Sequence, residues 1–295
     1  MLLVASVLAL IGRARNPADA ASFAAGARAE SEAEAWPSAA NADAQLPPLS
    51  MLERVYFTQR EGALRARNRG HYPYQGAWPC IWGEEAVCSG LNPMNPNDWK
   101  YVCGLRRIRS PRCVIYSIGS WAEMAFERGI KAARPDCEVH VWDISEFLVS
   151  SEEAARLNVT LHPFWLSNAS YASEVTVSCF PPRCDRVARR VRVEYTTLEA
   201  EMRRLGHTHI DILKMDAEGA EFQILLQLSR RQLNRIGQLQ LEVHESRGNG
   251  VATLMAHLES AGFRIFHQEE NYRNLGLFEY GVIRNTWHPT MFAGA

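Results

Sequence analysis

The chain has 295 residues, a formal net charge of −1 and a hydrophobic fraction of 47%. This length leaves room for one large α/β domain with appendages. The near-zero net charge gives no sign of a nucleic-acid partner or of a polybasic membrane-binding surface.

Residues 1–20 resemble a signal peptide. Leu2–Ile11 is a mainly apolar run of ten residues. It is too short to span a bilayer, which needs about 20 residues, but suits a signal-peptide core. The Ala-Asp-Ala at 18–20 offers a small-x-small cleavage site, although no Lys or Arg precedes the run and a disordered leader is the alternative. Residues 21–50, rich in Ala, Ser, Glu and Pro, are predicted to form a disordered stalk. The sequence therefore predicts a secretory-pathway protein with no membrane span in the mature chain.

Residues 51–110 are predicted to form a Cys-containing preface to the main domain, with a helix over 50–66 and then irregular loop. No C-x-x-C pair or zinc-type Cys/His spacing occurs in the chain. In an oxidising compartment, three cysteines of the preface are candidates for disulfides, and two later ones could close a small loop. Two more, in or beside predicted strands, are expected to be buried thiols. The three preface candidates are Cys80, Cys88 and Cys103. The small loop would be closed by Cys179 and Cys184, and the expected buried thiols are Cys113 and Cys137.

Residues 111–290 alternate between predicted strands and helices. This alternation predicts a doubly wound, mostly parallel sheet of about seven strands, covered by helices on both faces. The last two strands have no helix between them and are expected to pair as an antiparallel hairpin, and residues 174–195 read as an inserted hairpin. The predicted strands are 113–119, 138–143, 158–166, 210–216, 238–245, 263–269 and 277–284, and the predicted helices are 121–133, 151–157, 197–206, 220–233 and 251–262.

The first two strands of this alternation end in residues suited to a nucleoside. In such sheets, ligands bind at the carboxyl ends of the strands, near the switch point. Ser117, Gly119 and Ser120 close the first strand and open a helix, where glycine permits close approach of a ligand to free N–H groups. Asp143 ends the next strand, where an acid can accept hydrogen bonds from both ribose hydroxyls. The structural alternative for Gly119 is a tight turn.

The glycine turn disfavours a dinucleotide. It reads GSWAEM, with one glycine where a dinucleotide-binding turn has G-x-G-x-x-G. S-adenosylmethionine has no phosphate, and its sulfonium cation would account for acids at the end of a later strand. Those acids are Asp216 and Glu218, in the segment DILKMDAEGAEF at 211–222. The sequence therefore predicts S-adenosylmethionine as the cofactor, bound by Asp216 and the residues at the first two strand ends.

Several segments together resemble the FkbM-type methyltransferases, and most closely their methyltransferase-like branch of the secretory pathway. The resemblance covers roughly residues 78–285 and includes an upstream Trp-Lys-x-x-Cys segment. It implies a class I methyltransferase fold with S-adenosylmethionine as the methyl donor. The segments are VIYSIGS at 114–120, FE at 126–127, EVHVWD at 138–143, IDILKMDAEGAEF at 210–222, LQLEVHE at 239–245 and, upstream, NDWKYVCGL at 97–105.

The expected reaction is O-methylation of a small-molecule or glycan acceptor. His244 and Asp216 are the two candidate bases for the acceptor hydroxyl, unless His244 is only a hydrogen-bonded structural residue. Asp216 is expected to face the transferred methyl group and Glu218 to support the turn into the next helix, whereas simple helix capping is the alternative for both. The set Asp216, Glu218, Glu242 and His244 could also bind a divalent metal, but its spacing does not favour this over hydrogen bonding, and no metal is predicted.

One departure from the branch concerns activity. Trp121-Ala122 stands where the branch usually has Asn-Gly. A bulky Trp beside the glycine turn would crowd the methionine end of the cofactor, or would pack outward. The alternative function is therefore a catalytically inactive binding or scaffold protein that keeps the fold.

Overall fold

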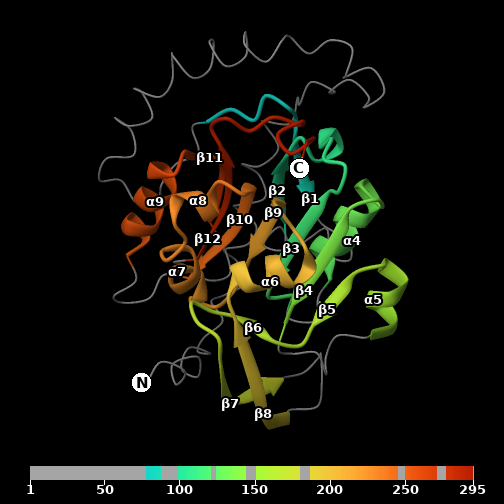
Figure 1. Cartoon of the computed structure of the whole chain (residues 1–295), viewed down its shortest axis with the longest axis vertical. Coiled ribbons are helices and arrows are strands. Elements are labelled where there is room, and N and C mark those ends of the chain that lie inside the picture. Colours follow the sequence, from blue (N-terminus) through green and yellow to red (C-terminus); the bar gives the residue numbers. More distant parts are fainter. Residues whose placement is uncertain are drawn as a thin grey trace, which may run out of the picture. The chain divides into compact units, whose positions relative to one another are not determined.

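The computed structural model describes residues 78–87, 99–120, 124–143, 151–179, 187–244, 250–270 and 277–294 (Figure 1). The predictions for the signal segment, the stalk and the helix over 50–66 lie outside these residues. So do Cys88, Cys184 and the Trp121-Ala122 departure.

The core of the described chain is a seven-stranded sheet, as the sequence predicts. The five strands β3, β4, β5, β9 and β10 pair in parallel, and β12 runs antiparallel to both of its neighbours. The order across the sheet is β11 (Phe263–Glu270), β12 (Leu277–Arg284), β10 (Ile236–His244), β9 (Ile210–Met215), β3 (Val114–Ile118), β4 (Glu138–Trp142) and β5 (Thr160–His162).

The switch point of the sheet lies between β3 and β9. From β3 the chain builds β4 and β5 on one side and then returns to build β9 and β10 on the other. Every residue of β3 and β9 is buried, as expected of parallel strands covered on both faces. Ligands of doubly wound sheets bind where the carboxyl ends of such strands meet.

Helices cover both faces of the sheet. One hydrophobic cluster joins the sheet to α6, α7 and α9, and a second joins its other face to α4, α5 and the segment before β3. The single helix predicted over 220–233 is wrong, because Ser229 and Gln232 form a capping box that starts a separate helix. The helices are α4 (Ala125–Ala133), α5 (Ser151–Leu157), α6 (Leu198–Leu205), α7 (Ala220–Leu225), α8 (Arg230–Leu233) and α9 (Val251–Ser260).

The preface contains structure that the sequence does not predict. Strands β1 (Glu84–Val87) and β2 (Lys100–Cys103) form an antiparallel pair, followed by the short 3-10 helix η3 (Leu105–Arg107). The side chain of Gln238 on β10 clamps the backbone of Cys103, because its Oε1 accepts from the Cys103 N–H at 3.0 Å and its Nε2 donates to the Cys103 carbonyl at 2.6 Å. This clamp fixes the end of β2 against the main sheet.

The excursion after β5 forms a separate three-stranded sheet, which projects at the bottom of Figure 1. The predicted hairpin is confirmed and is longer than expected, with β7 (Tyr171–Cys179) antiparallel to β8 (Val187–Thr196). The predicted strand over 158–166 divides at Pro163 into β5 and β6 (Trp165–Leu166), and β6 joins β8.

Two disulfides are present in the part of the chain that the structure describes. Cys80 pairs with Cys103, which are two of the three preface candidates. Cys113 pairs with Cys137, so the expectation of buried thiols there is wrong. These two residues immediately precede the adjacent parallel strands β3 and β4, which brings their Cα atoms to 4.6 Å. Loops of 23 and 24 residues closed in this way stabilise a fold by roughly 3–4 kcal/mol each.

Candidate functional site

The turn after β3 requires glycine. Gly119 has a φ of +74°, and a Cβ there would lie 1.8 Å from the Asp216 carbonyl oxygen. The Gly119 N–H donates to the Trp142 carbonyl at 3.0 Å, and the Asp216 N–H donates to the Ile118 carbonyl at 3.0 Å. The turn therefore joins the carboxyl ends of β3, β4 and β9 with almost no space between the backbones.

Asp143 holds this turn from the end of β4. Its side chain is buried, and its Oδ2 accepts from both the backbone N–H and the hydroxyl of Ser120, each at 2.7 Å. The structure thus brings together the predicted cofactor residues Gly119, Ser120 and Asp143.

Ser117 and Lys214 are the penultimate residues of β3 and β9, and they lie opposite each other in the sheet. The Lys214 ammonium donates to the Gly119 carbonyl. Beside them lies Glu127 of α4, which is 1% exposed and which the sequence did not single out as a site residue. Burial raises the pKa of Glu127, although Lys214 and Ser117 oppose this. Neither the Glu127 carboxylate nor the Ser117 hydroxyl has a hydrogen-bond partner of good geometry within the described ranges.

The three predicted catalytic residues converge at the ends of β9 and β10. His244 Nε2 lies 3.4 Å from Glu218 Oε2 and 3.9 Å from Asp216 Oδ1. Glu242, two residues before the end of β10, places its Oε1 3.9 Å from the same nitrogen. One imidazole therefore faces three carboxylates on a single edge.

A fourth carboxylate, Glu221 of α7, holds the other side of the imidazole. It is fully buried, and its Oε2 accepts from the Gly219 N–H at 2.9 Å. Its Oε1 accepts from the His244 N–H at 2.9 Å and lies 3.2 Å from His244 Nδ1. The support of the helix start that was predicted for Glu218 therefore belongs to Glu221, while Glu218 has a left-handed φ of 51° and a side chain that is 58% exposed. An acid in the first turn of a helix is the sequence signal that could have identified Glu221.

These contacts set the charges of the site. Burial alone would lower the pKa of His244, but Glu221, Glu218 and Asp216 raise it to about 9. Burial alone would raise the pKa of Asp216, but the nearby Lys214 and Lys100 lower it. With these charges His244 is an imidazolium at neutral pH, which cannot accept a proton, and Asp216 is ionised.

Lys100 lies beneath this edge and was not predicted to belong to the site. It reaches from β2 and is 4% exposed, with its Nζ 2.5 Å from Glu279 Oε1 and 3.3 Å from Glu242 Oε2. Glu242 and Glu279 lie directly opposite each other on β10 and β12, where like charges destabilise a sheet. Burial raises the pKa of both acids, and Lys100 opposes this shift. The Lys100 ammonium therefore stabilises the buried pair Glu242 and Glu279.

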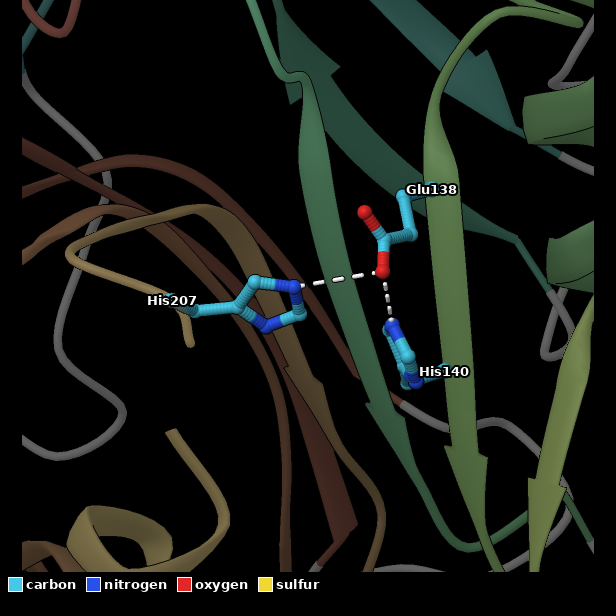
Figure 2. A group of neighbouring side chains, drawn as sticks. All are labelled: Glu138, His140 and His207. Carbon is cyan, nitrogen blue, oxygen red and sulfur yellow. Dashed lines mark hydrogen bonds and ion pairs between the residues drawn. The ribbon is translucent and has the colours of Figure 1, made fainter. Parts of the chain in front are cut away.

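A second group of possible metal ligands begins at the start of β4 (Figure 2). Both His140 Nε2 and His207 Nε2 approach Glu138 Oε1, at 2.8 and 3.2 Å. Arg112 also binds this carboxylate through two nitrogens, and the Tyr116 hydroxyl lies 2.6 Å from His207 Nδ1. Burial lowers the pKa of both histidines, that of His207 to about 4.

The hydrogen bonds behind His140 argue against a metal there. Arg204 approaches His162 Nδ1 at 3.1 Å, and an arginine can only donate. His162 must therefore carry its proton on Nε2, which donates to His140 Nδ1 at 2.9 Å. His140 must in turn carry its proton on Nε2 and donate it to Glu138. A protonated nitrogen cannot ligate a metal, so this group is a completed hydrogen-bond chain.

Within the residues that the structure describes, no helix combines the length and apolarity needed to cross a membrane.

Two curated relatives resemble part of the chain. "Probable methyltransferase-like protein 24" from Homo sapiens is 28% identical over 186 residues, which cover 58% of this chain and 47% of the human protein. The protein of the same name from Rattus norvegicus is 27% identical over a segment of the same length. The matched segment thus spans about half the length of these relatives.

Two solved structures give low similarity. A putative rRNA methylase from Clostridium thermocellum has a TM-score of 0.33 at 9% identity, covering 61% of this chain and 90% of that protein. MnmC2 from Aquifex aeolicus has a TM-score of 0.30 at 10% identity, covering 81% of this chain and 82% of that protein.

The family model Methyltransf_22, described as a methyltransferase domain, matches residues 86–284. This match includes the whole seven-stranded sheet, β2 and the last two residues of β1. The finer FkbM-type assignment stays a prediction. Because the match covers well over half of its residues, the chain belongs to the Methyltransf_22 family of methyltransferase domains.

Proposed function

We propose that the protein transfers a methyl group from S-adenosylmethionine to a hydroxyl oxygen of a small-molecule or glycan acceptor. One observation carries this proposal, the meeting of three strand ends at the switch point. There the Gly119 turn touches the Asp216 backbone and is held by Asp143.

The residues at this point suit the cofactor, which supplies a methyl group on a sulfonium cation when it is bound. Asp143 places a carboxylate at the end of β4, beside the Gly119 turn, and a carboxylate at such a strand end can accept hydrogen bonds from ribose hydroxyls. The buried Glu127 carboxylate and Ser117 hydroxyl are groups that an ammonium, such as that of the methionine tail, would satisfy. Asp216, ionised beside them, would attract the sulfonium.

The acceptor would bind over the ends of β9 and β10. Methyl transfer is an in-line displacement at carbon, so correct positioning of the acceptor oxygen supplies much of the catalysis. An acceptor hydroxyl must also lose its proton. Asp216 is the ionised group at this edge and is the proposed hydrogen-bond acceptor, with Glu218 and His244 around it.

We further propose that the protein works in the secretory pathway. Its two disulfides support this, because disulfides persist in oxidising compartments and are rare in the cytosol.

The proposal is tested by calorimetric titration of the full chain with S-adenosylmethionine. Hydrogen bonds to a charged group contribute roughly 1.5–3 kcal/mol, so Asp143→Ala should weaken binding by about 10- to 150-fold. The matched control is Asp136→Ala, which removes an exposed acid paired with Arg134 before β4 and should leave affinity unchanged. Equal affinity of Asp143→Ala and the parent would contradict the ribose placement. Binding without release of S-adenosylhomocysteine to any acceptor would instead favour the inactive scaffold.

A further inference from the structure

We propose that Asp216, Glu218 and His244 bind a first-row divalent metal ion such as Mn²⁺ at the ends of β9 and β10. We further propose that the bound ion holds the acceptor oxygen. This second part rests on the proposed function, whereas binding of the ion does not.

The geometry of the three side chains suits a metal. Their ligand atoms all lie within 4.8 Å of one another. Metal–ligand bonds of about 2.0–2.2 Å place neighbouring ligand atoms roughly 3.0–3.5 Å apart. The Nε2 of His244 is 3.4 Å from Glu218 Oε2 and 3.9 Å from Asp216 Oδ1, so these two separations need a contraction of at most about half an ångström. Glu218 is largely exposed and can turn to make it. Three protein ligands leave positions open for substrate, which is typical of catalytic metal sites.

The partner behind the imidazole distinguishes this group from the one around Glu138. A metal-binding histidine normally donates its other N–H to a carboxylate or carbonyl, which fixes the ring and its tautomer. Glu221 occupies that place 3.2 Å from His244 Nδ1, and two backbone N–H groups hold its carboxylate still. Because Nδ1 keeps its proton for Glu221, Nε2 is the nitrogen that faces Asp216 and Glu218, and the metal ion replaces the Nε2 proton when it binds. In the group around Glu138 the hydrogen bonds run in the opposite direction. Arg204 fixes the proton of His162 on Nε2, and His162 in turn fixes the only proton of the neutral His140 ring on Nε2, the nitrogen that would have to bind the metal.

The charge around the site also calls for a cation. Five carboxylates gather at this edge against two lysines and the His244 imidazole, so the acids outnumber the basic groups. Lys100 bridges Glu242 and Glu279, and Lys214 donates to the Gly119 carbonyl and stays 3.9 Å from Asp216 Oδ2. The carboxylates are those of Asp216, Glu218, Glu221, Glu242 and Glu279. Carboxylate and imidazole ligands together suit Mn²⁺ and its neighbours in the first row.

The test is a titration of the metal-stripped full chain with Mn²⁺, followed by the electron paramagnetic resonance of free Mn²⁺ and by calorimetry. We expect one ion per chain. His244→Ala should weaken binding by at least 100-fold, and Glu221→Gln, which removes a positioning residue, by about 10- to 100-fold. A thermal melt of each variant establishes that it is folded.

The matched control is His267→Gln. His267 lies 2.8 Å from Glu84 and 3.8 Å from Glu269, so it offers an imidazole between two acids away from the proposed site. Its replacement should leave Mn²⁺ binding unchanged. Absence of stoichiometric binding of Mn²⁺, and of Zn²⁺ and Mg²⁺ tested in parallel, would overturn the proposal, as would equal binding by folded His244→Ala.

Failure of the metal site and failure of the proposed function are distinguishable. If Mn²⁺ binds through His244 but S-adenosylmethionine does not bind, the metal site stands and the proposed function fails. If methyl transfer proceeds at full rate in protein that binds no ion, the metal site is overturned and the proposed function stands.

Discussion

Replacing Lys100 by methionine tests whether β2 is part of the site or only packs beside it. The ammonium is 4% exposed and lies between Glu279 at 2.5 Å and Glu242 at 3.3 Å. Methionine keeps much of the apolar stem but leaves two buried carboxylates facing each other across β10 and β12. Removing one partner of a buried ion pair typically costs about 3–5 kcal/mol. At roughly 2–4 °C per kcal/mol for a domain of this size, the melting temperature should fall by about 10 °C.

The pH dependence of this loss of stability shows whether the two buried carboxylates cause it. Without the ammonium, burial raises the pKa of Glu242 and Glu279 further above their unfolded values. Groups with a raised carboxyl pKa stabilise the fold while they are protonated, and this contribution is lost as the pH rises through the folded pKa. The penalty of Lys100→Met in urea unfolding should therefore be smaller at pH 5 than at pH 8. Adding Glu279→Gln should recover at least 1 kcal/mol, because the two residues interact directly.

The control is Lys131→Met, which removes a lysine that donates to the Cys137 carbonyl at 2.6 Å near the surface. It should cost less than about 1 kcal/mol. If Lys100→Met costs no more than this control, or if its cost does not change between pH 5 and pH 8, Lys100 does not stabilise the two buried acids.

Three further predictions concern the turn, the buried histidines and the disulfides. Gly119→Ala should lower the free energy of unfolding by more than about 3 kcal/mol in urea titrations, because the new Cβ would meet the Asp216 carbonyl. The control is Gly206→Ala, which has a similar φ of +70° but open space around it and should cost only about 1 kcal/mol. Equal costs for the two variants would contradict the close contact at Gly119. Burial lowers the pKa of His162 to about 3 and of His207 to about 4, so the unfolded chain binds more protons below pH 6.5. Stability should therefore decline steadily from pH 6.5 towards pH 4, and a flat profile in urea titrations would contradict the neutral cluster. Mass spectrometry of the native protein should find the Cys113–Cys137 bond, and its double serine variant should lose roughly 3 kcal/mol; seven free thiols would refute the pairing.

The sheet could be predicted because its signals are local. Each central strand is a buried apolar run that ends in glycine or aspartate, as at Gly119, Asp143 and Asp216. Strands β1 and β2 could not be predicted, because each has four residues and carries charged side chains such as Glu84 and Lys100. The two strands pair with each other, and they are held on the main sheet by residues more than 100 positions away, notably Gln238.

The site was predictable in part for the same reason. Acids at the ends of parallel strands must converge, so Asp216, Glu218 and His244 could be placed on one edge from sequence. The groups that set their charges are Lys100 and Glu221, and their roles depend on distances that no short segment contains. The disulfide at Cys113 likewise depends on the pairing of β3 with β4.

The switch point of this sheet is the proposed binding site of S-adenosylmethionine. The most direct measurement is equilibrium dialysis of the full chain against labelled S-adenosylmethionine, with S-adenosylhomocysteine and NAD as competitors. We predict one bound molecule per chain, displaced by S-adenosylhomocysteine and not by NAD. Failure to retain the label, or its displacement by NAD, would show that the switch point is not an S-adenosylmethionine site.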